Sequence, residues 1–306
     1  MDNLNISYSS SGTLDFCAKK FQLNKMFAQP PRHFESIAMA AGTALHAAFQ
    51  DFLIHGDLER GLMTLGLAYP HVNCWDSEDD RSWEACMATY LAMVDKASQR
   101  DWEVALILHD GIEKPAIEVP FEIVLEGVTL PDGRGVSYIG YIDAVMLHRG
   151  SRFGAVDIKT TRDRTRDRTA NFKYNEQQVP YGLVIEHLTG DEIKTFQVDY
   201  FDAFLDLVEP RVTLLDFDKT REDINHWAIS LAARVRNLIY FMQHGVFPRA
   251  GHGCVSYNRP CKYFDMCYAE DPETIQSLLL MGEEAAPPRE FDPWIKTTID
   301  MTELMK

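Results

Sequence analysis

The sequence predicts a mixed α/β (α+β) fold in which an antiparallel-rich central sheet is flanked by helices. Three observations support this class: apolar side chains recur at helical spacing through most of residues 7–110, segments rich in β-branched and aromatic residues follow between 116 and 161, and residues 221–245 form a long amphipathic stretch. With 306 residues, 46% of them hydrophobic, the chain can build one large domain or two ordinary ones.

The first part of the chain is predicted to be helical. Residues 7–27 begin with a Ser/Gly-rich capping stretch and continue as a helix that carries Cys17. Residues 36–56 form a second helix, so rich in alanine that another backbone or a ligand can approach it closely. Residues 57–115 are interpreted as a helical cap, with Cys74 and Cys86 as buried thiols.

The centre of the chain changes to strand patterns. Five segments have the composition of strands, and the turns PDGRG and HRGS separate the first three as an antiparallel meander. These segments are 116–128, 137–149, 152–161, 193–201 and 211–217. Helical spacing returns at 175–190, where Pro180 is tolerable only in the first turn. Gly245 ends the long amphipathic helix, and residues 283–306 have the composition of an extended tail.

These elements predict five structural segments. They are residues 1–56 (N-terminal helices), 57–115 (helical cap), 116–220 (the core sheet), 221–270 (the long helix and a cysteine-rich loop) and 271–306 (a C-terminal helix and the tail).

Charge and motifs exclude several classes of function. With 30 Lys and Arg against 46 Asp and Glu, the net charge of −16 excludes coating of nucleic acid or anionic membrane by bulk attraction. The N-terminus lacks the features of a signal peptide, and no apolar run approaches the roughly 18 residues that cross a bilayer. A soluble, cytoplasmic protein without a membrane partner is therefore expected. There is no G-x-x-x-x-G-K-[ST] loop, which argues against an ATP-driven motor.

The second and third strands are expected to bring two carboxylates together. A turn centred on Gly150 places Asp143 directly across from Asp157, and like charges at such a pair are destabilising. Lys159 lies two residues further on, hence on the same face as Asp157. Two carboxylates and an ammonium suit a hard divalent cation, Mg²⁺ or Mn²⁺. The alternative is an exposed hairpin with a cross-strand Asp/Lys salt bridge.

Such a site has a chemical use. A metal held by Asp143 and Asp157 can lower the pKa of a bound water, while Lys159 orients that water or stabilises charge on a phosphoryl group. His46 could add an imidazole ligand, which would favour Mn²⁺, although a lone histidine is more often a hydrogen-bonded core residue. Gln177 and Tyr181 are four residues apart and share a helix face.

These residues resemble a known family. The motifs are Gly42-Thr43-x-x-His46, Gly140-x-x-Asp143, Asp157-Ile158-Lys159 and Gln177-x-x-x-Tyr181. Their order resembles the PD-(D/E)XK nuclease superfamily in its RecB-like branch, over about residues 4–268. The resemblance implies a restriction-endonuclease-like core and a metal bound by His46, Asp143, Asp157 and the carbonyl of Ile158. It also implies that Lys159 is catalytic and that Gln177 and Tyr181 position the lysine or a DNA phosphate. Asp157 stands where many members have the longer Glu.

Three cysteines in Cys254-x6-Cys261-x5-Cys267 indicate a metal site that needs a fourth ligand, for which Cys17 is the best candidate. The chain resembles the iron–sulfur exonucleases related to the CRISPR-associated protein Cas-four and to the AddB nuclease domain. This resemblance implies a 4Fe–4S cluster in a C-terminal lobe, as a structural staple and not a catalyst. The x6 gap departs from the common C-x-x-C spacing. A four-thiolate zinc site and unligated thiols are the alternatives.

A basic run follows the strand that carries Asp157. Its candidate DNA-binding residues are Arg162, Arg164, Arg166, Arg168 and Lys173, with Phe172 or Tyr174 stacking on bases. The alternative is a solvated loop whose arginines and aspartates neutralise one another.

The expected function is therefore Mg²⁺- or Mn²⁺-dependent hydrolysis of DNA, from ends, by a metal-activated water. Single-stranded DNA and duplex ends are both compatible substrates. A homo-oligomer, or a complex with recombination, CRISPR or viral replication proteins, is also compatible with the sequence. The alternatives are a non-catalytic iron–sulfur protein that binds DNA or a partner, and a zinc-stapled hydrolase of another substrate.

Overall fold

The structure is a computed structural model. It describes residues 3–26, 37–69, 82–148, 152–161, 168–206, 209–251, 254–256, 259–261, 263–269, 273–274, 277 and 291–306. The chain divides into two compact units. Unit 1 comprises Met1–Phe34, Glu122–Gly140 and Asn225–Lys306, and unit 2 comprises Glu35–Phe121 and Tyr141–Ile224. Strands β5 (Ile117–Glu126) and β6 (Val136–His148) run through both, so each unit is described separately.

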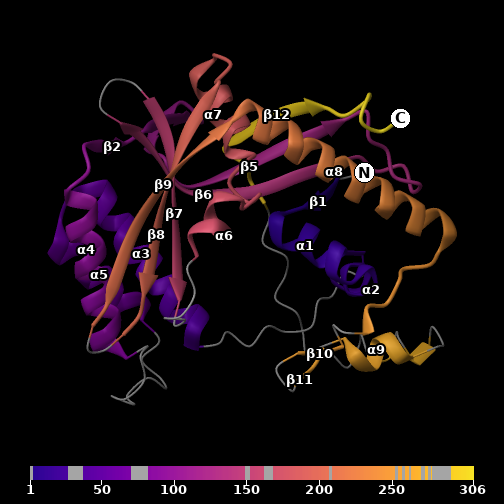
Figure 1. Cartoon of the computed structure of the whole chain (residues 1–306), viewed down its shortest axis with the longest axis horizontal. Coiled ribbons are helices and arrows are strands. Elements are labelled where there is room, and N and C mark those ends of the chain that lie inside the picture. The colour runs from indigo at the N-terminus through magenta and orange to yellow at the C-terminus, as the bar shows by residue number, and fades with distance from the viewer. Residues whose placement is uncertain are drawn as a thin grey trace. The chain divides into compact units, whose positions relative to one another are not determined.

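The strands of unit 2 form a mixed sheet. β6 pairs antiparallel with β7 (Arg152–Thr161), β7 pairs parallel with β8 (Thr195–Phe204), and β8 pairs antiparallel with β9 (Arg211–Thr220) (Figure 1). The antiparallel pairing predicted for segments 137–149 and 152–161 is thus present, and β8 adds a parallel neighbour to β7. Since every second residue of a strand faces the same side, Val156 and Ile158 enter one core while Asp157 faces away from it.

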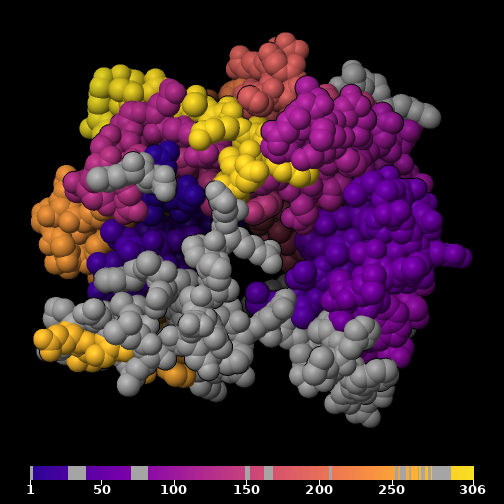
Figure 2. Space-filling model, turned by 180° about the vertical axis from the view of Figure 1, so that it is seen from behind, coloured from indigo at the N-terminus to yellow at the C-terminus, as the bar shows by residue number. Residues whose placement is uncertain are grey.

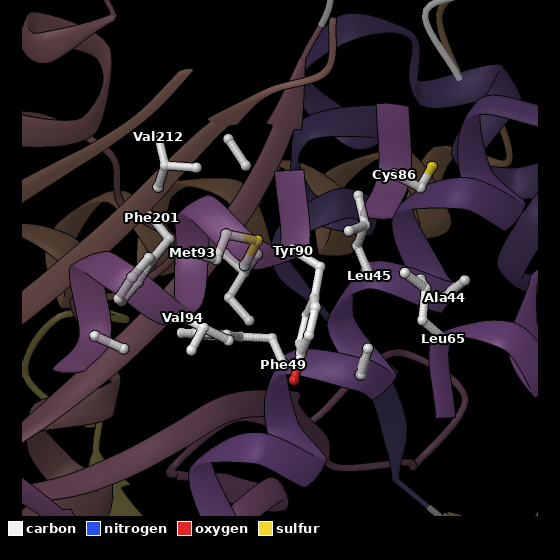
Figure 3. Close-up of a cluster of buried hydrophobic side chains, with 14 of the residues drawn as sticks. Ala44, Leu45, Phe49, Leu65, Cys86, Tyr90, Met93, Val94, Phe201 and Val212 are labelled. Carbon is white, nitrogen blue, oxygen red and sulfur yellow. The ribbon is translucent and has the colours of Figure 1, made fainter. Parts of the chain in front are cut away.

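Three helices cover one face of this sheet. They are α3 (Ile37–His55), α4 (Leu58–Ala68) and α5 (Trp83–Ser98). Phe49, Tyr90 and Phe201 are fully buried between the helices and β8 (Figure 3). Gly61 of α4 allows the close approach of α4 to α3, because a Cβ at this position would lie 2.9 Å from the carbonyl oxygen of Ala48 in α3. Figure 2 shows the outer side of α4 and α5 as a continuous purple surface.

The prediction of a helical cap over 57–115 was wrong for its last part. Residues 102–115 form β2 (Trp102–Val104), which pairs antiparallel with β6, and a hairpin of β3 (Leu106–His109) and β4 (Ile112–Pro115). At the turn Asp110 and Gly111 have φ of 54° and 75°. Two successive positive φ angles are typical of the tight hairpin turn that an Asp-Gly pair favours. The sequence therefore contained this turn, and the helical interpretation overlooked it.

The predicted helix 175–190 begins later than expected. α6 (Thr169–Lys173) is followed by turns, and α7 (Tyr181–Thr189) starts directly after Pro180. Proline disfavours helical backbone in the residue before it, which keeps Val179 outside the helix. α7 contacts β7. The absence of a side chain at Gly182 also lets α7 lie close to Phe196 of β8, since a Cβ at this position would be 2.8 Å from the Phe196 ring.

Unit 1 contains the two ends of the chain. β1 (Leu4–Ile6) pairs parallel with β6 and is followed by α1 (Tyr8–Phe16), α2 (Ala18–Phe21) and a π-helical turn (Gln22–Met26). The single helix predicted over 7–27 is thus broken at Cys17, whose φ of −159° is extended. α8 (Arg221–His244) matches the predicted long helix. The extended tail is instead partly β12 (Ile295–Asp300), which pairs with β5.

The described residues of the cysteine-rich part of unit 1 form short elements. They are β10 (Val255–Ser256), β11 (Arg259–Pro260) and α9 (Phe264–Tyr268). Among the helices that the structure describes, none combines the length and the apolar composition needed to cross a bilayer.

Candidate active site

The candidate site lies where the ladder between β6 and β7 ends. The ladder runs from His148 opposite Arg152 to Ala144 opposite Val156, which is the register that a turn centred on Gly150 predicts. Beyond it, Oδ2 of Asp143 accepts a 2.8 Å hydrogen bond from the N–H of Ile158. A side chain of β6 thus takes the place of the next backbone contact to β7.

Three potential metal ligands converge at this point. His46 of α3, Glu118 of β5 and Asp143 of β6 place one ligand atom each within 4.8 Å of one another. Within the described ranges this is the one group of three or more His, Cys, Asp or Glu side chains that close together. Two carboxylates and one imidazole suit a divalent cation such as Mg²⁺ or Mn²⁺.

His46 is a neutral imidazole. Burial, followed by the nearby ammonium of Lys159, lowers the pKa of His46 to about 4. Its Nδ1 lies 3.7 Å from Oδ2 of Asp143, and because the ring is uncharged at neutral pH this contact is not an ion pair. A neutral ring is the form that binds metals.

The positive charge near Asp143 does not compensate for its burial and for the neighbouring carboxylates. Burial, followed by the charge of Asp157, raises the pKa of Asp143 to about 8, and Glu118 adds to the rise. The ammonium of Lys159 and the N–H of Ile158 act in the opposite direction without reversing it. The carboxyl group therefore holds a proton at neutral pH unless a cation replaces it. The imidazole and the two carboxylates are suitable ligands for a divalent metal, and its positive charge would compensate for the negative charge of the carboxylates.

Glu118 is a site residue that the sequence analysis missed. Its φ of 48° is unusual for a non-glycine residue and costs about 1 kcal/mol or more. Gln50 of α3 donates a 2.5 Å hydrogen bond from Nε2 to Oε1 of Glu118, which fixes the carboxylate. Nothing in the sequence distinguishes Glu118 from the other acidic residues of exposed strand positions, since its role depends on this local backbone conformation.

Asp157 belongs to a second part of the site. Nζ of Lys159 lies 2.8 Å from Oδ2 and 3.1 Å from Oδ1 of Asp157, and Nε2 of Gln178 donates to Oδ1 over 2.9 Å. Of the four metal ligands expected from the family resemblance, His46 and Asp143 lie in one group, to which Glu118 also belongs. The carboxylate of Asp157 instead contacts the ammonium of Lys159. Ile158 contributes its N–H to Asp143 and a further backbone hydrogen bond to His46.

The Gln177 and Tyr181 pair is arranged differently from the expectation of one shared helix face. Residues 177–180 form turns, so the spacing of four does not align the two side chains. Tyr181 is buried, and its hydroxyl donates to the carbonyl of Tyr141 over 3.1 Å. The backbone N–H of Gln177 donates to Asn175, and the amide that reaches Asp157 comes from Gln178.

The basic run is described only at its end, because Arg162, Arg164 and Arg166 lie outside the described residues. Nη1 of Arg168 lies 2.6 Å from Oδ1 of Asp202, and its guanidinium stacks over the ring of Phe172. Nζ of Lys173 lies 5.6 Å from the ring centre of Tyr174. Phe172 is buried, so stacking of this ring on bases was a wrong expectation, whereas Tyr174 is 75% exposed.

The four candidate cluster cysteines lie in unit 1. Cys17, Cys254, Cys261 and Cys267 are free and partly buried. Burial raises the pKa of the Cys267 thiol, and the neighbouring Cys17 and Cys254 add to the rise. No three sulfurs among the described cysteines lie within 4.8 Å of one another, so these residues do not form the compact arrangement of a single-ion thiolate site such as the zinc alternative. Cys86 is buried as predicted, and Cys74 lies outside the described residues.

Comparison with known families now decides the assignment. The family model of the PD-(D/E)XK nuclease superfamily matches residues 5–268. The chain belongs to this superfamily. The match contains every element of the candidate site, including the Asp157-Ile158-Lys159 motif on β7.

Solved structures and curated proteins add little to this superfamily assignment. The chain is 14% identical to a "putative exonuclease" from Eubacterium rectale, with a TM-score of 0.45 over 87% of this chain and 94% of that one. It is 12% identical to the protein SSO0001, with a TM-score of 0.28 over 90% of this chain and 98% of that one. We draw nothing further from likenesses of this size. No curated protein matches the sequence.

Proposed function

We propose that this superfamily member is a metal-dependent deoxyribonuclease of the RecB-like branch. The observation that carries the proposal is the group of His46, Glu118 and Asp143, next to the Asp157–Lys159 ion pair. The first three residues need a cation, and the ion pair supplies an ammonium beside it. That combination is suited to the hydrolysis of a phosphodiester.

His46, Glu118 and Asp143 would hold the cation. A divalent metal supplies Lewis acidity, which favours attack of water on a phosphodiester. Oxygen ligands suit both Mg²⁺ and Mn²⁺, and the neutral imidazole of His46 favours Mn²⁺ more. Gln50 would keep the Glu118 carboxylate oriented toward the site through its 2.5 Å hydrogen bond.

Lys159 would stabilise the negative charge that develops on the phosphate. Asp157 is 1% exposed and holds the ammonium in place, whereas the Lys159 side chain is partly exposed and can meet a substrate. A positive charge that is fixed before the reaction needs no reorganisation when charge develops.

Tyr141 supports DNA with unstacked bases as the substrate. It lies two residues before Asp143 on β6, hence on the same face, and is 51% exposed. The hydroxyl of Tyr181 fixes its carbonyl. An exposed aromatic ring beside a phosphate-cleaving site can stack on a base of single-stranded or frayed DNA. The resemblance to RecB-like exonucleases supports cleavage from ends.

A 4Fe–4S cluster held by the four cysteines of unit 1 is a separate part of the proposal. Its support is the electrostatic interaction of the Cys267 thiol with Cys17 and Cys254. Thiolates of a cubane bind different irons, so they need not approach one another as closely as ligands of one ion. Iron and sulfide analysis after anaerobic purification tests this part. A colourless protein with stoichiometric zinc contradicts it.

End-labelled DNA tests the nuclease proposal. We expect the wild-type protein to shorten single-stranded DNA progressively in Mg²⁺ or Mn²⁺, and to leave it intact in chelator. Lys159→Ala should abolish cleavage. Lys296→Ala is the matched control because Lys296 forms a comparable ion pair with Glu122, 2.9 Å away in unit 1.

Several outcomes would contradict parts of this proposal. Undiminished cleavage by Lys159→Ala contradicts the site, and an inactive wild-type protein that still binds DNA supports the non-catalytic alternative. Internal cuts from the first time point contradict exonuclease action only. A cytoplasmic location, expected from the sequence, stays a prediction.

A further inference from the structure

A buried chain of hydrogen bonds leads from β8 to the candidate site. Asp157 of β7 and Tyr200 of β8 are partners in the parallel ladder, and both side chains are buried. Gln178 joins them: its Nε2 donates to Oδ1 of Asp157 over 2.9 Å, and its Oε1 accepts from the Tyr200 hydroxyl over 2.8 Å. Gln178 is itself fully buried.

The chemistry of the three groups fixes the direction of this chain. An ionised carboxylate only accepts hydrogen bonds, so the amide of Gln178 must present its nitrogen to Asp157. Its oxygen then faces Tyr200, whose hydroxyl must donate. The carboxylate therefore selects the orientation of the Gln178 amide, and the Tyr200 hydroxyl holds the amide in that orientation by donating to its oxygen.

Tyr200 is well placed for this role because its ring cannot move freely. It stacks on Phe172 with ring centres 4.8 Å apart, and Phe217 packs edge-on against it with ring centres 5.8 Å apart. The hydroxyl also lies 3.2 Å from the carbonyl oxygen of Phe172.

The segment that leads into Gln178 is held as well. Nζ of Lys219, a buried residue of β9, donates to the carbonyls of Lys173 and Asn175 over 2.6 Å and 3.3 Å. The backbone before Gln178 is thus fixed by Lys219 while Tyr200 fixes the side chain. Tyr200 on β8 and Lys219 on β9 both lie outside the four sequence motifs.

We propose that Tyr200 is a positioning residue of the nuclease site. Through Gln178 it fixes the carboxylate of Asp157, which in turn holds the ammonium of Lys159. The inference rests on the proposed function, because the consequence of this positioning is measured as DNA cleavage. Tyr200 is fully buried, so it acts through Gln178 and does not contact DNA.

The first test is Tyr200→Phe, which removes only the hydroxyl. We expect kcat for DNA cleavage to fall about tenfold, because misplacement of a reacting group lowers the rate without weakening substrate binding. KM for DNA should stay within about twofold. Mn²⁺ affinity, measured by electron paramagnetic resonance, should also be unchanged, since the potential metal ligands are His46, Glu118 and Asp143, and Tyr200 is not among them.

A double-mutant cycle separates positioning from a general structural effect. Gln178→Met removes the amide and keeps the length of the side chain. If Tyr200 acts through Gln178, adding Tyr200→Phe to Gln178→Met should lower kcat no further. Additive losses overturn the inference. The cycle also covers the case in which Tyr200→Phe folds poorly, because Gln178→Met alone must then lower kcat with unchanged KM.

The matched control is Tyr90→Phe. Tyr90 is another fully buried tyrosine, and its hydroxyl donates to the carbonyl of Leu58 over 3.2 Å, away from the site. Its substitution should leave kcat unchanged. Equal losses in both variants overturn the inference. A wild-type protein that cuts no DNA contradicts the proposed function, whereas a cutting wild type with an equally active Tyr200→Phe overturns the positioning role alone.

Discussion

The N–H of Ile158 donates a 2.8 Å hydrogen bond to Oδ2 of Asp143 at the end of the β6–β7 ladder. The same carboxylate belongs to the group with His46 and Glu118. Asp143 thus accepts a hydrogen bond from the backbone and is also one of three potential metal ligands. A substitution that keeps the hydrogen-bond acceptor but removes the charge of Asp143 can therefore distinguish these two interactions.

Asp143→Asn should stabilise the metal-free protein while it inactivates the enzyme. The folded pKa of Asp143 is raised to about 8, so its contribution to stability is fully present below the unfolded pKa and is lost as pH rises through about 8. Asparagine can still accept from Ile158 but carries no charge. In chelator at pH 9, we expect a Tm at least about 2 °C above wild type.

The pH dependence of that difference in Tm is the control. The gap between Asp143→Asn and wild type should widen between about pH 4 and pH 8 and then level off. A wild-type protein that is the more stable of the two at pH 9 without metal would contradict the uncompensated charge of Asp143. Cleavage by the variant should be lost at every pH.

Metal binding should release a proton at neutral pH. Asp143 is protonated at pH 7 when no cation is present, and His46 is already neutral. Calorimetric titration with Mn²⁺ in buffers of different ionisation enthalpy should therefore show release of about one proton at pH 7. The release should approach zero above pH 9. Release that does not depend on pH would show that another group titrates.

Glu118 should be a ligand that depends on Gln50. Glu118→Gln should weaken Mn²⁺ binding strongly, and Gln50→Met should weaken it about 10- to 100-fold, as loss of an outer-shell partner typically does. Glu113→Gln, an exposed carboxylate of β4, is the matched control. If Glu118→Gln binds Mn²⁺ as the wild type does, Glu118 is not a ligand.

Tyr141→Ala should weaken the binding of single-stranded DNA. Stacking of a base on an aromatic ring is worth about 1–3 kcal/mol, so KM should rise about tenfold while kcat changes little. Tyr240→Ala is the control, because Tyr240 is similarly exposed on α8. Steady-state cleavage of single-stranded oligonucleotides measures both constants. An unchanged KM would remove Tyr141 from the DNA-binding surface.

The sequence predicted those features of the site that follow from strand periodicity. The expected turn centred on Gly150 predicted the register of β6 and β7, and the period of two predicted that Lys159 lies on the same side as Asp157. Both statements need only local backbone geometry. The superfamily was inferred from the resemblance of the motif order to a known family, and the family model over residues 5–268 confirms it.

The remaining features depend on tertiary structure. Glu118 joins the site through a positive φ and a contact from α3, and Gln178 replaces Gln177 at Asp157 because turns precede α7. The hairpin at Asp110 is different, since its Asp-Gly pair was visible in the sequence. Long-range hydrogen bonds such as that of Tyr200 leave no local pattern.

Pulsed electron paramagnetic resonance of the Mn²⁺-loaded protein tests the central claim most directly. The account predicts a coupling between Mn²⁺ and one imidazole nitrogen in the wild type. The coupling should disappear in His46→Gln and persist in His55→Gln, a histidine at the end of the same helix. Absence of nitrogen coupling in the wild type, or its survival in His46→Gln, would contradict a metal centre formed by His46, Glu118 and Asp143.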